Sequence, residues 1–244
     1  MSKKNSNVIL KNEFVDFKNL SEIFKEFEKK LNKLKSKKYL VAVSGGPDSL
    51  ALTALSMAYG SKIKTKFYYV LINHNIRKKS KTEASKVKLL LKLHGIDLKI
   101  ITIKRKIFKN IQNEARNQRY ELLANYCNKY NIKIILTAHN LEDQVETFFI
   151  RLSRGSGLTG LSAMKPLSKL DKKIDLLRPL LDVEKHYLIK FSKLVFKKFI
   201  NDPSNKNTKF LRTKIRNLKK PLMQSGITYD QIIKSINNLA SSNE

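Results

Sequence analysis

The feature that most constrains the fold of this chain is a short turn with the sequence Ser44-Gly45-Gly46-Pro47-Asp48-Ser49. It directly follows an apolar run at 39–43 and leads into a helical pattern at 50–58, which Gly60 is expected to close. Adjacent glycines let backbone N–H groups close around an anion, and the amino end of the following helix adds positive potential. The segment therefore predicts a pyrophosphate site. An ordinary strand-to-helix turn is the alternative, and the Walker A and Gly-x-Gly-x-x-Gly patterns are absent.

The alternation of apolar runs and helical periods continues through the middle of the chain. Strands are predicted at 67–72, 98–103 and 132–137, and helices at 83–93, 113–130 and 142–152. This order predicts an α/β fold with a doubly wound parallel sheet, because each helix crosses over between parallel strands. Ligands of such sheets bind beyond the carboxyl ends of the strands. The segments after Val43, Ile72 and Thr137 are therefore expected to meet at one crevice.

Further helical patterns flank this alternation. Apolar residues recur at helical spacing over 17–36 and predict an amphipathic helix that packs on the domain. After Arg154 the pattern loosens into a glycine-rich loop and a proline-containing stretch to Leu181, followed by helical runs at 182–193 and 213–222. Residues 229–244 predict a terminal helix with a polar tail. The 244 residues thus fit one α/β domain with a short helical extension at the carboxyl end.

The charge balance indicates an anionic partner. The chain has 50 Lys and Arg against 20 Asp and Glu, a formal net charge of +30. Such a field attracts phosphate polymers or anionic membranes, and nucleic acid is the leading candidate. An AT-rich coding sequence, which favours Lys, Asn and Ile, is the alternative source of part of the excess. Only nine of the basic residues are arginines, whose planar forks bind phosphate or carboxylate bidentately and so mark candidate sites.

Composition also excludes several classes of protein. Cys127 is the only cysteine, so the chain can form neither an internal disulfide nor a cluster that needs several of its own thiolates. No apolar stretch reaches the ~18 residues of a membrane span, and the amino terminus has no apolar run of signal-peptide length. We therefore expect no membrane partner and a cytoplasmic location.

Two histidines stand where the predicted strands end. His74 and His139 each follow a strand, where an imidazole can reach a phosphate or the ring of a nucleotide. A structural hydrogen bond is the alternative for each of them.

Four arginines are candidates for contact with RNA or with an oxyanion. Arg151 and Arg154 enter a loop that contains Gly155 and Ser156, and cations beside exposed amides suit such ligands. Arg212 and Arg216 lie one helical turn apart and predict a basic stripe for RNA.

The turn at 44–49 resembles the PP-loop of the ATP pyrophosphatases, which cleave ATP to AMP and pyrophosphate while adenylating a substrate. The resemblance implies that the backbone of the turn, with Gly45, Gly46 and Pro47, and the hydroxyls of Ser44 and Ser49 hold the pyrophosphate of ATP. It also implies that Asp48 helps to bind Mg²⁺, a cation that proteins commonly hold through a carboxylate together with phosphate oxygens.

Motifs further along the chain narrow the resemblance. The segments 73–77, 115–120, 137–147 and 151–158, with shorter matches nearer the carboxyl end, resemble the tRNA(Ile)-lysidine synthetases over roughly residues 38–221. The family commonly has Asp where this chain has Asn73 and Glu142. By this resemblance Arg77 joins the ATP-binding residues and Arg116 binds phosphate. Pairing of the arginines at 116 and 119 with nearby glutamates is the alternative.

The acidic residues of segment 137–147 gain a role from the same resemblance. Glu142, Asp143 and Glu146 occupy the first turns of a predicted helix, spaced so that their side chains share one surface. The general preference of carboxylates for helix amino ends is the alternative. Beside the PP-loop they are candidates to orient Mg²⁺ and to receive the ammonium group of a lysine substrate, with Asp143 as metal ligand and base.

The reaction that the resemblance implies has two steps. C2 of the wobble cytidine in an isoleucine tRNA with a CAU anticodon attacks the α-phosphate of ATP, and the ε-amine of free L-lysine then displaces AMP. The product, lysidine, changes codon reading from AUG to AUA. A PP-loop tRNA thiolase and a non-catalytic RNA-binding protein are the alternatives, and the single cysteine weighs against the thiolase.

The same resemblance suggests how the chain is divided. We expect an N-terminal helical extension at 1–37, a PP-loop ATP pyrophosphatase catalytic domain at 38–221, and a terminal helix and tail at 222–244. The tRNA is expected to be held by the lysine-rich surface or by the second subunit of a homodimer.

Overall fold

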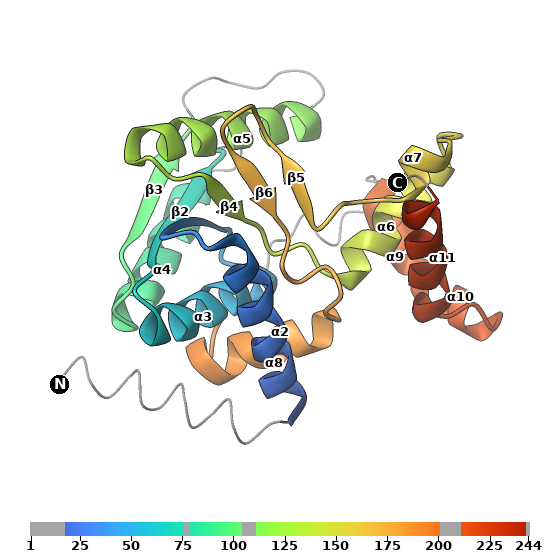
Figure 1. Cartoon of the computed structure of the whole chain (residues 1–244), viewed down its shortest axis with the longest axis horizontal. Helices are drawn as coiled ribbons and strands as arrows, with labels where there is room; N and C mark the ends of the chain where they lie inside the picture. The colour runs from blue at the N-terminus through green and yellow to red at the C-terminus, as the bar shows by residue number, and fades with distance from the viewer. Residues whose placement is uncertain (1–17, 76–78, 104–110, 201–210, 243–244) are drawn as a thin grey trace.

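The computed structural model describes residues 18–75, 79–103, 111–200 and 211–242, without the side chains of residues 18, 111 and 112. Six strands form one sheet in the order β3-β2-β1-β4-β6-β5 (Figure 1). The parallel strands are β1 (Lys38–Val43), β2 (Lys66–Asn73), β3 (Leu98–Thr102), β4 (Ile134–Leu136) and β6 (Asp175–Leu177). The edge strand β5 (Leu167–Lys169) pairs antiparallel with β6. The predicted doubly wound parallel sheet is therefore confirmed.

Helices cover both faces of this sheet. The helices α2 (Lys18–Leu34), α3 (Pro47–Lys62), α4 (Ser80–Leu93) and α8 (Lys185–Phe196) contribute to one apolar core, and α5 (Ile111–Tyr130) covers the opposite face. Strand β1 shows why two cores form. Its side chains alternate, so Tyr39 and Val41 enter the first core while Leu40 enters the second. Both faces of β1 are buried, as expected of a central parallel strand.

A third apolar cluster lies to one side of the sheet. Helix α6 (Leu141–Leu152) starts at the sheet edge and packs with α7 (Leu158–Leu161) and the terminal helix α11 (Tyr229–Ser241) (Figure 1). Val145 of α6 is fully buried against Ile232 and Ile236 of α11. Two short helices, α9 (Leu211–Asn217) and α10 (Lys219–Gln224), complete this group. The end of the chain is thus anchored on the helix that carries the predicted acidic residues.

Three element boundaries differ from the predictions. Helix α3 continues through Gly60 to Lys62, and the bare face of Gly60 lets the ring of Phe67 pack so closely that a Cβ added there would lie 3.1 Å from it. The helical run at 213–222 is two helices, because Pro221 has no N–H to continue the α9 hydrogen bonds. The proline-containing stretch to Leu181 holds β5 and β6, whose three residues each are too short to show a period.

The helical run predicted at 182–193 is α8, which begins and ends three residues later. Most other predicted ends lie within three residues of those in the structure. Gly95 has a φ of +74° and ends α4, with the N–H of Ile96 returning to the carbonyl of Leu91 at 3.0 Å. Throughout the described ranges, no helix is both long enough and apolar enough to cross a bilayer.

Candidate active site

The turn at 44–49 joins the end of β1 to the start of α3. Gly45 has a φ of +85°, a conformation that glycine adopts readily. The buried hydroxyl of Ser49 accepts hydrogen bonds from the N–H groups of Ser44 (3.1 Å) and Gly45 (3.0 Å), and donates to the carbonyl of Gly46 (3.0 Å). The Ser44 hydroxyl donates to the hydroxyl oxygen of Ser49 at 3.1 Å. In this structure the two serine hydroxyls therefore shape the turn itself.

The amides of the first turn of α3 provide the positive end that an anion needs. The first N–H groups of an α-helix have no acceptor within the helix. Gly46 at the N-cap offers no side chain to satisfy them, and Pro47 at the first helical position has no N–H to leave unpaired. The amides of Asp48 and Ser49, together with the helix dipole, therefore suit a bound phosphate group.

Gly45→Ala is expected to lower the free energy of unfolding by about 2–4 kcal/mol, because strain and overpacking add. A Cβ at Gly45 would lie 2.4 Å from Cγ2 of Val87 on α4, in addition to the strain of its positive φ. Gly95→Ala is the matched control. Its φ of +74° is similar, but nothing lies within 4 Å of the added Cβ, so it should cost only about 1–2 kcal/mol.

Urea unfolding of both variants measures this difference. Because Val87 is a core residue, Val87→Ala has a cost of its own, but the double change Gly45→Ala with Val87→Ala should cost less than the sum of the two single changes. If Gly45→Ala were no more damaging than Gly95→Ala, the close contact between the turn and α4 would be disproved.

Four carboxylates gather beside the turn. Asp48 lies in the first turn of α3, and Glu142, Asp143 and Glu146 lie in the first two turns of α6. Burial is the main cause that raises the pKa of Asp48, and the nearby charges of Asp143 and Glu142 raise it further, while Lys185 lowers it. Glu146 is only 1% exposed. Acids about a hundred residues apart in the sequence thus share one region because β1 and β4 are neighbours.

Asp143 also takes part in capping the amino end of α6. Its Oδ2 accepts from the N–H of Asn140 at 3.2 Å, and the side chain of Asn140 accepts from the N–H of Asp143 at 3.0 Å. This reciprocal pair is a capping box. Oδ2 of Asp143 therefore serves the amino end of the helix, as the general preference of carboxylates predicts. The other oxygen, Oδ1, accepts a hydrogen bond from Nη2 of Arg212 at 2.8 Å.

Cations from the carboxyl-terminal half of the chain pair with all four carboxylates. Arg212 donates from Nε to Glu146 at 2.6 Å and from Nη2 to Asp143 at 2.8 Å, and Arg216 donates from Nε to Glu146 at 2.7 Å. The other pairs join Lys185 to Asp48 at 3.2 Å and Lys219 to Glu142 at 3.3 Å. The two arginines predicted to form a stripe for RNA thus face the acidic residues, although each keeps about a third of its side chain exposed.

One carboxylate oxygen in this region has no partner. Oδ1 of Asp48 is buried and forms no hydrogen bond with the described residues. Within that same part of the chain, no three acidic, histidine or cysteine side chains are placed to hold a metal together. Magnesium commonly uses only one or two carboxylates plus phosphate oxygens. Asp48, with Asp143 near it, therefore fits a Mg²⁺ that shares its coordination with a nucleotide.

The two predicted histidines lie beyond β2 and β4 and are both neutral near pH 7. Nε2 of His74 lies 3.1 Å from Nη2 of Arg119, and Nδ1 of His139 lies 2.9 Å from the hydroxyl of Thr137. Burial, helped by Arg119, lowers the pKa of His74 to about 4. Burial, helped first by Arg178, lowers the pKa of His139 to about 3. Each imidazole can therefore offer a hydrogen bond without adding a charge.

The shifted pKa of His139 predicts a pH-dependent stability. Below pH 6.5 the unfolded chain protonates this histidine and the folded chain does not, so the folded state loses stability as the pH falls toward 3. Between pH 7 and pH 5 the free energy of unfolding of the unmodified protein should fall by about 1–2 kcal/mol more than that of His139→Asn. Urea unfolding at both pH values measures this. Carboxylates titrate in both proteins, so equal losses would contradict a buried neutral imidazole.

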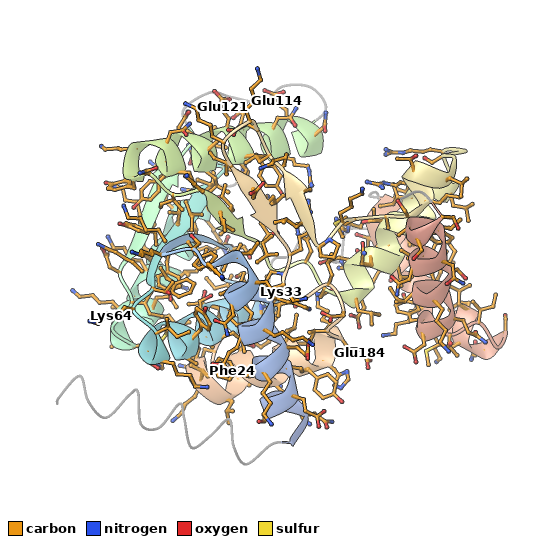
Figure 2. The ribbon with its side chains drawn as sticks, viewed as in Figure 1. Phe24, Lys33, Lys64, Glu114, Glu121 and Glu184 are labelled. Atoms are coloured by element: carbon orange, nitrogen blue, oxygen red, sulfur yellow. The ribbon has the colours of Figure 1, made fainter. Side chains whose placement is uncertain are left out.

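Arg116 is not engaged by the neighbouring glutamates. Its guanidinium lies over the ring of Tyr120, 5.1 Å from the centroid, and Glu114 accepts instead from Gln118 at 3.0 Å. Figure 2 shows Glu114 and Glu121 along the outer side of α5. Among the described residues no ion pair joins Arg116 to either of them, so its charge remains available to a ligand.

The loop after α6 is not brought to the carboxylates. The rise of a helix, about 1.5 Å per residue, puts Leu152 roughly 14 Å along the axis from Asp143. Arg151 donates to the carbonyls of Gly160 and Ala163, both at 2.7 Å. The N–H groups of Gly155 and Ser156 return to α6 and end that helix, while Arg154 is exposed. Roles for this loop in binding a substrate stay predictions, as does that of Arg77, which lies outside the described residues.

Sequence reasoning assigned no role to three cations of this region. Lys185, Lys219 and Arg178 are brought in by α8, by α10 and by the end of β6. No local pattern distinguishes either lysine in a chain with so many. Arg178 lies in one of the shorter segments near the carboxyl end that resemble the family, a match that indicates no particular role for it. The substituted position Asn73 is buried, and its side chain accepts from the N–H of Asn75 at 3.0 Å, which is a local structural bond.

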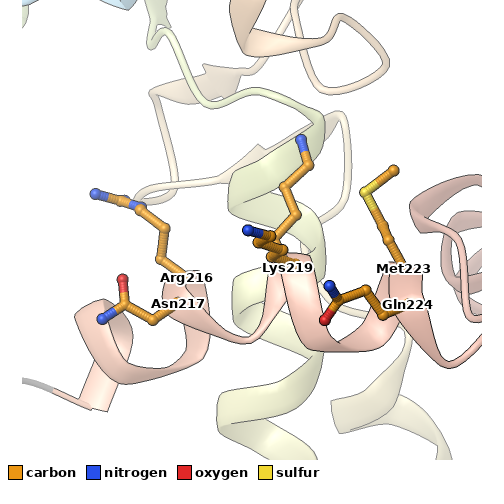
Figure 3. A pocket seen from close by; sticks show the side chains of 6 residues that line it. Arg216, Asn217, Lys219, Met223 and Gln224 are labelled. Atoms are coloured by element: carbon orange, nitrogen blue, oxygen red, sulfur yellow. The ribbon is translucent and has the colours of Figure 1, made fainter.

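An open cavity of about 600 Å³ lies along α9 and α10, the helices that carry cations paired with the carboxylates. Arg216 and Lys219 border it together with Lys220, Met223 and other residues of these helices (Figure 3). The lining residues carry only positive charges, so the cavity suits an anionic ligand rather than a cationic one.

The fold and the turn together define an α/β nucleotide-binding domain whose phosphate site follows the first central strand. Comparison with known proteins identifies its family. The PP-loop domain matches residues 19–222, so the chain belongs to the PP-loop family.

Several curated proteins are similar to this chain. The tRNA(Ile)-lysidine synthase of Orientia tsutsugamushi (strain Boryong) is 39% identical over 205 residues, which are 82% of this chain and 46% of that protein. The tRNA(Ile)-lysidine synthase of Wolbachia pipientis wMel is 43% identical over 183 residues, 74% of this chain and 42% of that protein. The chain therefore spans about half the length of these relatives.

A solved structure supports the fold. The U34-tRNA thiolase NcsA from Methanococcus maripaludis superposes with a TM-score of 0.74 at 17% sequence identity, covering 90% of this chain and 79% of that one. At this identity the likeness concerns the fold alone.

Proposed function

We propose that this protein is a tRNA(Ile)-lysidine synthetase, a ligase that forms a carbon–nitrogen bond between L-lysine and C2 of the wobble cytidine of isoleucine tRNA. The observation that carries the proposal is the meeting of the PP-loop with four carboxylates at one end of the sheet. The match to the PP-loop domain at residues 19–222 covers both of these segments, and two tRNA(Ile)-lysidine synthases are similar to most of the chain. The net charge of +30 suits an RNA substrate.

In the first step the cytidine attacks the α-phosphate of ATP and pyrophosphate leaves. The amides at the start of α3 would hold the leaving pyrophosphate, and Arg116 would bind a phosphate oxygen. Asp48 and Asp143 would hold Mg²⁺, which neutralises charge on the phosphates when it is bound. The neutral imidazoles of His74 and His139 would donate hydrogen bonds to the nucleotide.

In the second step lysine displaces AMP from the adenylated cytidine. Its ammonium group requires carboxylates, and Glu142, Asp143 and Glu146 are the available set. Because Arg212 already contacts Asp143 and Glu146, an ammonium bound there would share these carboxylates with the guanidinium or displace it, whereas Glu142 is paired only with Lys219. Asp143 is the proposed base, since one of its oxygens is committed to the helix cap and the other faces the exchangeable Arg212.

The other two functions are less well supported. A PP-loop tRNA thiolase that uses cysteines of its own is disfavoured, because Cys127 is fully buried in the core against α5 and burial raises its pKa to about 12. It is therefore no thiolate at neutral pH. A non-catalytic RNA-binding protein would have no use for the unpartnered Asp48 oxygen beside a phosphate-binding turn.

The experiment is incubation of the full chain with ATP, Mg²⁺, labelled L-lysine and isoleucine tRNA bearing a CAU anticodon, followed by counting label in the RNA. Methionine tRNA, which has the same anticodon, is the matched control. We expect incorporation into the isoleucine tRNA. Release of pyrophosphate without incorporation would retain the adenylation step and reject the lysine step. If the chain neither incorporates label nor releases pyrophosphate, the RNA-binding protein is favoured.

A further inference from the structure

Arg178 is a buried arginine that no carboxylate neutralises among the described residues. It is 7% exposed, and its Nη1 donates to the carbonyl of Lys165 at 2.8 Å and to the hydroxyl of Ser168 at 3.0 Å. Its Nε is buried and has no partner in that part of the chain. A charge out of water is costly unless it is paired. Two neutral oxygens on one nitrogen leave most of this guanidinium without compensation.

The position of Arg178 directs it toward the crevice. Leu177 pairs with Leu136, so Arg178 lies level with the segment that leads from β4 to α6. Side chains alternate along a strand, which puts Arg178 on the same face as Leu176, the face that α5 covers. Tyr120 and Arg116 of α5 lie near enough to influence its charge. Arg178 therefore stands at the carboxyl edge of the sheet, opposite the α3 side that carries the PP-loop.

Three arginines lie near His139 in this part of the crevice, and no ion pair joins any of them to a carboxylate among the described residues. The charges of Arg178, Arg116, Arg212 and Arg119 all help to lower the pKa of His139, and of these four only Arg212 is paired with carboxylates in the described structure. Arginine can only donate, so Nε2 of His74 accepts from Arg119 and the proton of His74 is on Nδ1. That Nδ1 is also buried without a partner in the described structure. The missing element is an acceptor with several oxygens and a negative charge.

We propose that Arg178 is a substrate-contacting residue that, with Arg116, binds a phosphate group of the reactants on the α5 side of the crevice. The proposal rests on the proposed function for the identity of those reactants. A phosphate there has two sources, the triphosphate of ATP or the RNA backbone beside the reacting nucleotide. Both present the same acceptor oxygens to a guanidinium.

Binding measurements with Arg178→Met test this directly. One arm uses an ATP analogue with a non-hydrolysable α–β bridge, and the other uses a short RNA hairpin with a CAU loop. We expect affinity for one of these ligands to fall about 10- to 100-fold, as for loss of a charge-assisted hydrogen bond. If the RNA is that ligand, the slope of log affinity against log salt should also fall by about one.

Two further variants separate ligand binding from folding. Ser168→Ala removes one anchor of the guanidinium and keeps its charge, so it should lower the melting temperature slightly and leave both affinities unchanged. Arg178→Lys keeps a positive charge if the methionine variant does not fold, and it should still weaken binding because the planar fork is lost. Unchanged affinities in a folded Arg178 variant, or an equal loss in Ser168→Ala, would overturn the proposal.

Lysine is absent from both binding assays, which keeps this result separate from the proposed function. An unmodified protein that binds both ligands but incorporates no lysine would reject the synthetase and leave the role of Arg178 standing. Failure of the unmodified protein to bind either ligand would reject both.

Discussion

Replacement of Asp48 by asparagine is expected to reduce ATP-dependent pyrophosphate release on the order of a thousand-fold, a loss of several kcal/mol of charge stabilisation. The change preserves the shape of the side chain and removes the negative charge. Oδ1 of Asp48 is buried and unpartnered in the described structure, while Oδ2 receives one bond from Lys185 at 3.2 Å. A divalent cation is the group best able to use that free oxygen, and an amide binds it poorly.

Although Asp48→Asn should lose activity, its melting temperature should stay the same or rise. The pKa of Asp48 is raised, chiefly by burial, so its charged form costs the folded state free energy that is absent at low pH and present once the pH exceeds the folded pKa. Asparagine removes that cost at pH 7. We therefore expect lost activity with an unchanged or higher melting temperature, together with loss of any stabilisation that Mg²⁺ and ATP give jointly.

Asp182→Asn is the matched control for this prediction. Asp182 makes a close ion pair with Lys30 at 2.6 Å but keeps 62% of its side chain exposed. The same chemical change there should leave pyrophosphate release intact. Retention of normal activity by Asp48→Asn would show that the carboxylate has no part in binding Mg²⁺ and ATP.

Glu146→Gln should lower the free energy of unfolding by about 2–3 kcal/mol, near the lower end of the range for breaking a buried ion pair. Glu146 is 1% exposed and receives bonds from both Arg212 and Arg216 at 2.6–3.1 Å. Loss of its charge leaves two partly buried guanidiniums beside a neutral amide. The lower end applies because about a third of each arginine side chain remains in contact with water. Urea unfolding measures the loss.

A double-mutant cycle and a matched glutamate test the origin of that cost. Combining Glu146→Gln with Arg216→Gln should cost less than the sum of the two single changes, because the second change removes one stranded cation. Glu142→Gln should be milder, at about 1 kcal/mol or less, since its partner Lys219 is 41% exposed and 3.3 Å away. Strict additivity in the cycle would mean that the ion pair between Glu146 and Arg216 contributes no coupling in solution.

The elements that position the PP-loop could be predicted from sequence because their signals are local. A buried apolar run, two adjacent glycines and a proline at the first helical position determine the path from β1 through the turn to α3. The alternation of strand and helix periods likewise predicts the parallel sheet and the edge where ligands bind. The hairpin of β5 and β6 escaped prediction, because two three-residue strands are stabilised by their neighbours rather than by a pattern of their own.

The ion pairs of the candidate site, in contrast, could not be predicted from the sequence. Sequence alone places Asp48 within the glycine-rich turn at 44–49 and places Glu142, Asp143 and Glu146 in the first turns of a helix. Only the tertiary structure decided which cations face them and left Arg178 without a counter-charge among the described residues. A periodic pattern records which face of an element is apolar, but an ion pair between residues 66 positions apart depends on how α6 and α9 pack. Coulombic partners are chosen by distance in space, for which spacing along the chain gives no measure.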